Sequence, residues 1–256
     1  MKTKITLLAA GIIFLLSACE RQIYTPALYH QDIAYQPKPA SFDSAKTANY
    51  LSGGLNYYLD QTWTDLLISA QFNYSRAHVF KNFNLSYGAF GVAGDYDKSS
   101  TGSSPNDFSN KFFGAAGARA SANLFTNYGR MDFRYLGVEM AYSHEFGSFA
   151  DFRKFINTQP GYEADTRTDL FTLGLSSEII FHNQNNNNIE HGIRLFLGTT
   201  FGPNPVGINS GYASSGLTPP AFRDVFPKVS YFINSKHFFG VGEFGSAIFL
   251  RAGYKF

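Results

Sequence analysis

The sequence predicts an all-β protein, a closed antiparallel up-and-down transmembrane β-barrel of about ten strands, with eight strands as the alternative. Three observations support this. From residue 48 onward, apolar and polar residues alternate with a period of two, which is typical of strands with two unlike faces. Charged residues make up only 16% of the chain and aromatic residues 17%, whereas soluble domains usually carry about 25% charge. The alternation also continues to the last residue, Phe256.

The alternation is clearest between residues 66 and 75. The even positions are all apolar, whereas the odd positions are polar except for Leu67. Similar patterns occur at 83–89, 136–143, 171–181, 193–198 and 248–256. No segment after residue 48 shows a convincing helical period, although residues 149–156 are compatible with one short helical turn in a loop.

A soluble β-sandwich would alternate as well, so the composition of the two faces decides between the two folds. The apolar faces of these strands end in aromatic residues, as in the girdles of membrane barrels. The other faces are rich in Gly, Ser, Asn and Thr, where a soluble sandwich would expose many Lys and Glu. A sheet surrounded by lipid must also close, because an open edge would leave backbone groups without hydrogen-bond partners.

The strands can be placed from the pattern. We predict strands at 48–59, 63–77, 80–94, 112–125, 130–146, 168–182, 189–201, 225–233, 236–243 and 246–256. Residues 225–245 are compatible with two strands, or with one bent strand and part of a loop. The second interpretation gives the eight-stranded alternative.

The connections between these strands alternate in length. Residues 95–111, 147–167 and 202–224 are long and polar, whereas 78–79, 126–129 and 183–188 are short. This is expected when one rim faces the outside and the other faces the periplasm. An even strand count places both ends of the barrel, residues 48–256, on the periplasmic rim.

The amino terminus resembles the signal peptide of bacterial lipoproteins. Lys2 and Lys4 precede a short apolar run at 5–16, which is too short to span a membrane and fits a secretory signal peptide. The next residues complete a lipobox, Leu16-Ser17-Ala18-Cys19. This resemblance implies cleavage of residues 1–18, a diacylglycerol on the Cys19 sulfur, usually an N-acyl chain such as palmitate, and a mature chain that begins at Cys19. Glu20, where the enterobacterial sorting rule has Asp for inner-membrane retention, implies the outer membrane.

Residues 19–47 show no period and contain Pro26, Pro37 and Pro39 between tyrosines. Proline favours an extended, semi-rigid spacer. We therefore expect a lipid-anchored tether that joins the acyl chains to the barrel on its periplasmic side without passing through it. The alternative is a segment that packs into or under the barrel through its tyrosines.

Inward-facing charges form the next candidate feature. The parity of the strands places five charged side chains in the lumen, namely Arg119, Glu139, Glu178, Arg194 and Arg251, with Glu243 as a sixth candidate. Narrow barrels fill their interiors with side chains, and an unpaired buried charge is costly. We predict that these residues form a structural charge network. Arg134 breaks the parity of its strand, which indicates a position at the periplasmic rim or a bulge.

Signs of catalysis or metal binding are weak. The six histidines show no zinc-binding spacing, and the single Cys excludes a disulfide framework or a Cys-based zinc site. We find no Gly-x-Ser-x-Gly elbow and no phosphate-binding loop. His144, beside Ser143 and Glu145, is the best-placed candidate base, but neighbours on a strand point to opposite faces. We expect no enzyme activity, no metal and no cofactor beyond the acyl chains on Cys19.

Taken together, these features resemble lipidated outer-membrane β-barrels of Bacteroidota-type bacteria and, in architecture, small OmpA-type barrels. In this setting Phe256 resembles the carboxy-terminal insertion signal of such barrels. The resemblance implies outer-membrane lipid and the lipoprotein-sorting and barrel-insertion machineries as partners, and the net charge of +2 gives no case for nucleic acid.

Two functions remain open, and a hydrolase is a distant third. The first is a non-enzymatic structural barrel or accessory subunit of an envelope assembly, with the loops 95–111, 147–167 and 202–224 as contact surfaces. The second is a narrow pore or a barrel that transports a small molecule.

Overall fold

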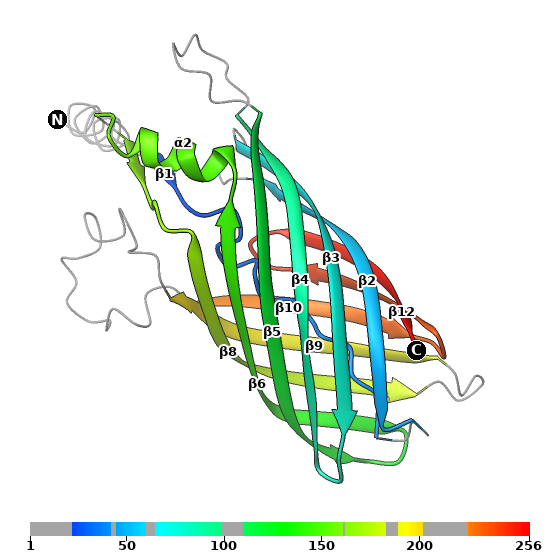
Figure 1. The fold of residues 1–256 in the computed structure, drawn as a ribbon. Coiled ribbons are helices and arrows are strands. Elements are labelled where there is room, and N and C mark those ends of the chain that lie inside the picture. Colours follow the sequence, from blue (N-terminus) through cyan, green and yellow to red (C-terminus); the bar gives the residue numbers. More distant parts are fainter. Residues whose placement is uncertain are drawn as a thin grey trace, which may run out of the picture.

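The computed structural model describes residues 22–41, 45–59, 65–98, 110–160, 162–182, 189–201 and 225–256. Ten strands form a closed antiparallel barrel, in which they follow one another in chain order and the last pairs with the first (Figure 1). These strands are β2 (Thr47–Leu59), β3 (Asp65–Val79), β4 (Phe83–Lys98), β5 (Lys111–Asn127), β6 (Met131–Phe146), β8 (Asp169–His182), β9 (Glu190–Phe201), β10 (Val225–Asn234), β11 (Phe238–Phe244) and β12 (Ile248–Lys255).

The predicted ten-stranded barrel is confirmed, and the eight-stranded alternative is wrong. The region 225–245 divides into β10 and β11, joined by a turn at 235–237 in which Ser235 N–H donates to the Phe238 carbonyl. The short helical turn expected at 149–156 is also present, as α2 (Ser148–Ile156).

The outer surface of the barrel is apolar. The exposed residues of the strands alternate with buried ones, and most of the exposed ones are large and apolar, such as Leu55, Phe72, Leu195 and Leu250. The buried partners include many Ser, Asn, Gln and charged side chains. The hydrophobic face of the sheet therefore points outward and its polar face points inward, as a bilayer around the barrel requires.

The two rims differ, and we name them by their connections. The turn rim carries the short connections 80–82, 128–130, 183–189 and 235–237, together with the start of β2 and the end of β12. The loop rim carries the connections 99–110, 147–168 and 202–224, as well as the shorter 60–64 and 245–247. The long connections thus lie on one rim, as the sequence predicted.

Histidine–tyrosine pairs lie on the outer surface close to the turn rim. His78 Nε2 is 3.4 Å from Tyr87 Oη, and His191 Nδ1 is 2.8 Å from the hydroxyl of Tyr231. His237 stacks on Tyr254, with 5.9 Å between the ring centroids. Amphipathic rings of this kind favour a membrane–water interface, where one end is apolar and the other is hydrated. The pairs therefore mark one edge of the apolar band.

Strand β6 contains an irregularity next to Arg134. The pairing of β6 with β8 shifts between Arg134 and Gly137, and Tyr135 and Leu136 are both exposed in succession. One extra residue reverses the alternation, so Arg134 points inward and is buried. The prediction of a bulge is confirmed, and Arg134 lies four residues into β6, near the turn rim.

The glycines of β4 allow a direct test of the close packing of this wall. A Cβ on Gly88 would lie 2.7 Å from Ser75 Cα and closer still to the Tyr74 carbonyl oxygen. The nearest atom to a Cβ on Gly91, on the same strand, would be 4.0 Å away. We expect Gly88→Ala to lower the free energy of unfolding by about 1–3 kcal/mol, and Gly91→Ala to change it by less than about 0.5 kcal/mol. Urea titration of both variants in micelles measures the difference, and equal stabilities would contradict it.

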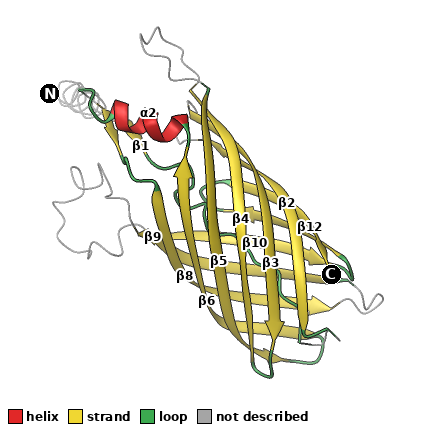
Figure 2. Ribbon diagram, in the orientation of Figure 1, coloured by secondary structure: helices red, strands yellow, loops and turns green. Residues whose placement is uncertain are grey.

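A helix and a two-stranded sheet lie at the loop rim. Helix α2 lies across this end of the barrel, and β1 (Gln22–Tyr24) pairs in parallel with β7 (Tyr162–Ala164) beside it (Figure 2). Phe149, Phe152 and Ile156 of α2 are buried. Among the described residues, no helix is long and apolar enough to cross a membrane.

Candidate functional site

Residues 24–41, which we call the lumen segment, run inside the barrel. Figure 1 shows this part of the chain in blue, passing between the strands from β1 toward the start of β2. Residues 31–40 are all buried, and Ile33, Asp32 and Tyr35 are at most 1% exposed. The prediction that residues 24–41 form a spacer between the acyl chains and the barrel is therefore wrong. The alternative prediction, that this segment packs into the barrel, holds for these residues.

The width of the barrel explains this correction. The diameter of a barrel grows with the number of strands, and eight strands leave an interior that side chains alone can just fill. Ten strands leave a wider interior. Here the lumen segment supplies the missing volume. It contributes Tyr24, Ala27 and Leu28 to one buried apolar cluster, Tyr35 to a second and Ile33 to a third.

At the loop rim, the segment is fixed by aromatic packing and by one carboxylate. The ring of Tyr24 packs edge-on against Phe152 of α2, with 5.4 Å between centroids. The backbone N–H of Ala27 donates to Glu145 Oε2 at 2.6 Å. Glu145 also forms a buried ion pair with Arg153 of α2. The helix, the wall and the segment are thus joined through a single carboxylate.

In the middle of the barrel, charged side chains of the wall bind the backbone of the segment. Lys228 Nζ donates to the Ile33 carbonyl at 2.7 Å, and Arg119 Nε donates to the Asp32 carbonyl at 2.5 Å. Glu243 Oε2 accepts from the Tyr35 N–H at 3.0 Å, while Arg251 donates to the Tyr35 carbonyl.

These contacts have a clear physical reason. After turns at residues 26–32, the segment pairs with no strand of the barrel, so its backbone groups lack ladder partners. Buried backbone groups must be satisfied in some other way. The wall charges supply those partners, and hydrogen bonds to charged groups are stronger than those between neutral groups.

Toward the turn rim, an ion triad holds the segment. Glu178 accepts from Lys38 Nζ at 3.2 Å and from Arg134 at 2.6 Å, and the three side chains are at most 1% exposed. Arg134 also donates to the Pro39 carbonyl at 2.9 Å. Asp132 then accepts from the Ser41 N–H at 2.6 Å. The segment is therefore fixed along the whole length of the lumen.

The structure places all five predicted lumen charges inside the barrel. Arg194 and Glu139 form a two-bonded pair at 2.6 and 2.8 Å. Arg251 lies 3.8 Å from Glu243, the sixth candidate. Glu178 pairs with Lys38 and Arg134 and not with another predicted member.

Arg119 differs from the others, because its charge faces neutral groups. It donates to Asn73 Oδ1 at 2.7 Å and lies 3.7 Å above the ring of Phe90, in addition to its bond to the Asp32 carbonyl. The main role of this arginine is to bind the lumen segment, and its part in a charge network is smaller.

Sequence reasoning missed several residues of the lumen. These are Asp132, Glu145, Arg153 and Lys228 on the wall and at α2, together with Lys38 and Asp32 on the segment. Lys228 and Ser230 of β10 face inward, whereas Val229 between them faces outward. The alternation of this strand could therefore have placed Lys228 in the lumen. No pattern marks Lys38, because its partners lie on β6 and β8, far along the chain.

The buried charges are nearly balanced. Among the described residues, seven buried cationic side chains stand against eight buried anionic ones. The cations are Lys38, Arg119, Arg134, Arg153, Arg194, Lys228 and Arg251, and the anions are Asp32, Asp132, Glu139, Glu145, Asp165, Glu178, Glu190 and Glu243. Most carry ion pairs or hydrogen bonds to the segment. This arrangement is typical of a fixed interior and offers no excess charge to attract one kind of ion.

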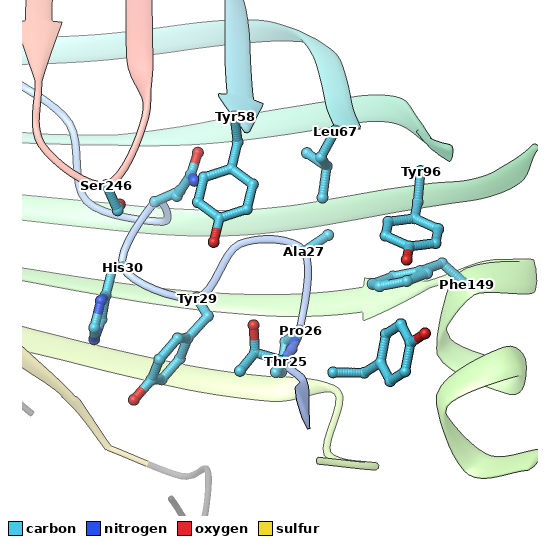
Figure 3. Close-up of a pocket in the computed structure, with 12 residues that line it drawn as sticks. Thr25, Pro26, Ala27, Tyr29, His30, Tyr58, Leu67, Tyr96, Phe149 and Ser246 are labelled. Atoms are coloured by element: carbon cyan, nitrogen blue, oxygen red, sulfur yellow. The ribbon is translucent and has the colours of Figure 1, made fainter. Parts of the chain in front are cut away.

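A small cavity lies at the loop-rim end of the lumen (Figure 3). Residues 24–27 and 29–31 form one side of it, and Tyr58, Leu67, Tyr96 and Phe149 belong to its remaining lining. Its volume is about 110 Å³, whereas pockets for drug-sized ligands measure about 300–1,000 Å³. This space suits a few water molecules or one small polar group.

The candidate base His144 is separated from its sequence neighbours. Ser143 and Glu145 are buried and face the lumen, whereas His144 is exposed on the outside. Its Nδ1 lies 3.0 Å from Asp169 Oδ1, and Tyr142 donates to the same oxygen at 2.6 Å. Within the described residues, no group of three or more His, Cys, Asp or Glu is placed to hold a metal ion.

The two chain ends were also singled out by the sequence. The lipobox and Cys19 lie outside the described residues. Phe256 continues the pairing of β12 with β2, because its N–H donates to the Asn49 carbonyl at 3.0 Å and its carbonyl accepts from Asn49 at 2.8 Å. Its side chain is 60% exposed.

Comparisons with known proteins add little to this geometry. No protein-family model matches the chain, and no curated protein matches it. Similar solved structures include the outer membrane protein OprG from Pseudomonas aeruginosa, at 12% identity and a TM-score of 0.36, covering 83% of this chain and 96% of that one. The translocator domain of the autotransporter NalP from Neisseria meningitidis has 6% identity and a TM-score of 0.37, covering 84% and 88%.

A bacterial polysaccharide outer membrane secretin is also similar, at 9% identity and a TM-score of 0.25, covering 84% of this chain and 99% of that one. These values are too low to support an argument about function. The fold is established by the strand pairing of this chain itself, which closes a ten-stranded antiparallel barrel.

Proposed function

We propose that this chain is a non-enzymatic β-barrel lipoprotein of the outer membrane, anchored through acyl chains on Cys19, and that it serves as a structural or accessory subunit of an envelope assembly. The observation that supports this most directly is the occupied lumen. A barrel whose axis is filled by its own chain, bonded from one rim to the other, is built to remain closed. The apolar outer face and the closed sheet support placement in a membrane.

The loop rim supports the role of an accessory subunit. Helix α2 buries one face in the barrel mouth and leaves Phe155 50% exposed, beside Lys154 and Asp151. An exposed aromatic surrounded by charges is typical of a binding anchor with a polar rim. Together with the connections 99–110 and 202–224, this helix is the surface we assign to a partner.

A photo-cross-linking amino acid at Phe155 tests this surface in living cells. We expect a discrete protein adduct from Phe155, and none from the same amino acid at Leu195, which is 57% exposed on the apolar wall. Mild-detergent extraction should recover the chain in a complex that contains the cross-linked partner. A lone monomer without adducts at Phe155 would contradict the accessory role.

Planar-bilayer recording separates this proposal from the pore alternative. We expect the full-length protein to give no steady conductance above the lipid baseline, because the lumen segment fills the barrel. An open porin inserted under the same conditions serves as the positive control. Arg119→Ala removes one bond to the segment but leaves the others, so this variant should remain closed as well. A steady ohmic conductance of the unmodified protein would favour the pore.

A further inference from the structure

The lumen segment runs from the loop rim to the turn rim, so the chain enters the barrel at the loop rim. Its first residues lie at the loop rim, where the Asp165 N–H donates to the Tyr24 carbonyl at 2.8 Å and β1 pairs with β7. Its last residue, Ser41, binds Asp132 at the turn rim. The Lys46 carbonyl, just before β2, accepts from Val79 at 2.7 Å at the same rim. The chain therefore crosses the whole barrel before the first wall strand begins.

The orientation of the barrel follows from its rims. In outer-membrane barrels the short turns face the periplasm and the long loops face the outside. Here the three long connections and α2 share one rim, together with the shorter 60–64 and 245–247. The other rim carries only short connections, with the start of β2 and the end of β12. The loop rim is thus the outer one, and Gln22 lies there as the first residue of β1.

We propose that the amino-terminal segment crosses the membrane inside the barrel, so that the chain before Gln22, with the acyl anchor on Cys19, contacts the outer leaflet at the cell surface. Three residues span at most about 11 Å when fully extended. Cys19 therefore cannot reach the periplasmic leaflet while Gln22 stays at the loop rim. This inference rests on the proposed function, which supplies the membrane and the acylated Cys19.

This placement replaces the expected one. An even-stranded barrel with both ends in the periplasm suggested a tether and an anchor on the same side as those ends. The segment instead enters at the loop rim and runs through the barrel to the turn rim. Hydrogen bonds to four wall residues hold it along this path, namely Glu145, Arg119, Lys228 and Glu178.

A lipidated amino terminus need not be pulled through a finished barrel to reach this position. The wall closes where β12 pairs with β2, the last and first barrel strands in the chain. The sheet can therefore wrap around a segment that is already in place, and the seam can form afterward. The many wall charges that bind the segment backbone would guide this wrapping.

Labelling of single cysteines on intact cells tests the inference. Three exposed positions receive a cysteine in the full-length chain: Thr25→Cys at the start of the lumen segment, Ser246→Cys in the β11–β12 turn at the loop rim, and Lys236→Cys in the β10–β11 turn at the turn rim. A membrane-impermeant maleimide is applied before and after permeabilisation. The unmodified chain gives the blank, and heat-modifiable gel mobility shows that each variant is folded.

We expect Thr25→Cys and Ser246→Cys to react on intact cells, and Lys236→Cys to react only after permeabilisation. If Ser246→Cys and Lys236→Cys behave so but Thr25→Cys needs permeabilisation, the inference is overturned and the proposed function stands. If Ser246→Cys does not react on intact cells, the proposed membrane orientation fails as well. An epitope inserted after Glu20 gives a second measurement, and antibody binding to intact cells is expected. Binding only after permeabilisation would overturn the inference.

Discussion

Replacing Glu178 by alanine is expected to lower the free energy of unfolding by about 3–5 kcal/mol, because it leaves two buried cations without their counter-ion. Lys38 and Arg134 both bind this carboxylate, and none of the three side chains is more than 1% exposed. Lys38 belongs to the lumen segment, whereas Arg134 and Glu178 belong to the wall. The loss should therefore loosen the segment at the turn rim and destabilise the barrel around it.

The matched control is Asp151→Ala on α2. Asp151 pairs with Lys154 at 3.2 Å, but its side chain is 78% exposed, and exposed ion pairs contribute only about 0–1 kcal/mol. Urea titration in micelles, followed by heat-modifiable mobility, compares the two variants. Equal losses would show that the Glu178 triad does not hold the segment. Glu178→Gln, which keeps the shape and one acceptor, should fall between the two.

Replacing Tyr35 by alanine is expected to lower the free energy of unfolding by about 3–5 kcal/mol, since it removes a large ring from the middle of the lumen and leaves a cavity. Tyr35 is 0% exposed and stacks on Phe232 with 4.3 Å between ring centroids. It also belongs to the buried cluster that contains Ile180 and Val241, on two other strands. The ring is thus the main apolar contact between the segment and the wall at this level.

Tyr35→Phe is the control for this prediction, because it keeps the ring and the stacking. We expect it to retain most of the stability of the unmodified protein, while Tyr35→Ala lowers the urea midpoint strongly. If the alanine variant is as stable as the phenylalanine variant, the segment does not pack in the lumen as described. The same comparison repeated by proteolysis should show cleavage within 24–41 in the alanine variant only.

The strands could be predicted from sequence because the environment of this wall is simple. Lipid on one side and a polar interior on the other impose a strict period of two, and that period gave ten strands with bounds close to those observed. The parity also placed Arg119, Glu139, Glu178, Arg194 and Arg251 inside. The pair of Arg194 with Glu139 follows from parity and opposite charge, although parity alone does not specify which members meet.

The course of residues 24–41 could not be predicted in this way. The segment has no period, and its prolines favour an extended chain wherever that chain lies. Its partners are distant: Arg251 binds the carbonyl of Tyr35 across 216 residues of sequence, and Lys228 binds that of Ile33 across 195. Arg134 was equally hard to place, since its inward position depends on one extra residue in β6.

The sequence by itself therefore determined the wall as a closed sheet of about ten strands, with its apolar outer face, its two unlike rims and the parity of its lumen charges. Only the tertiary structure decided what fills the wall and in which direction. The physical reason is that alternation is a local property, set by the two faces of each strand. The path of an unpaired segment depends instead on backbone groups that find their partners among side chains distributed around a closed barrel.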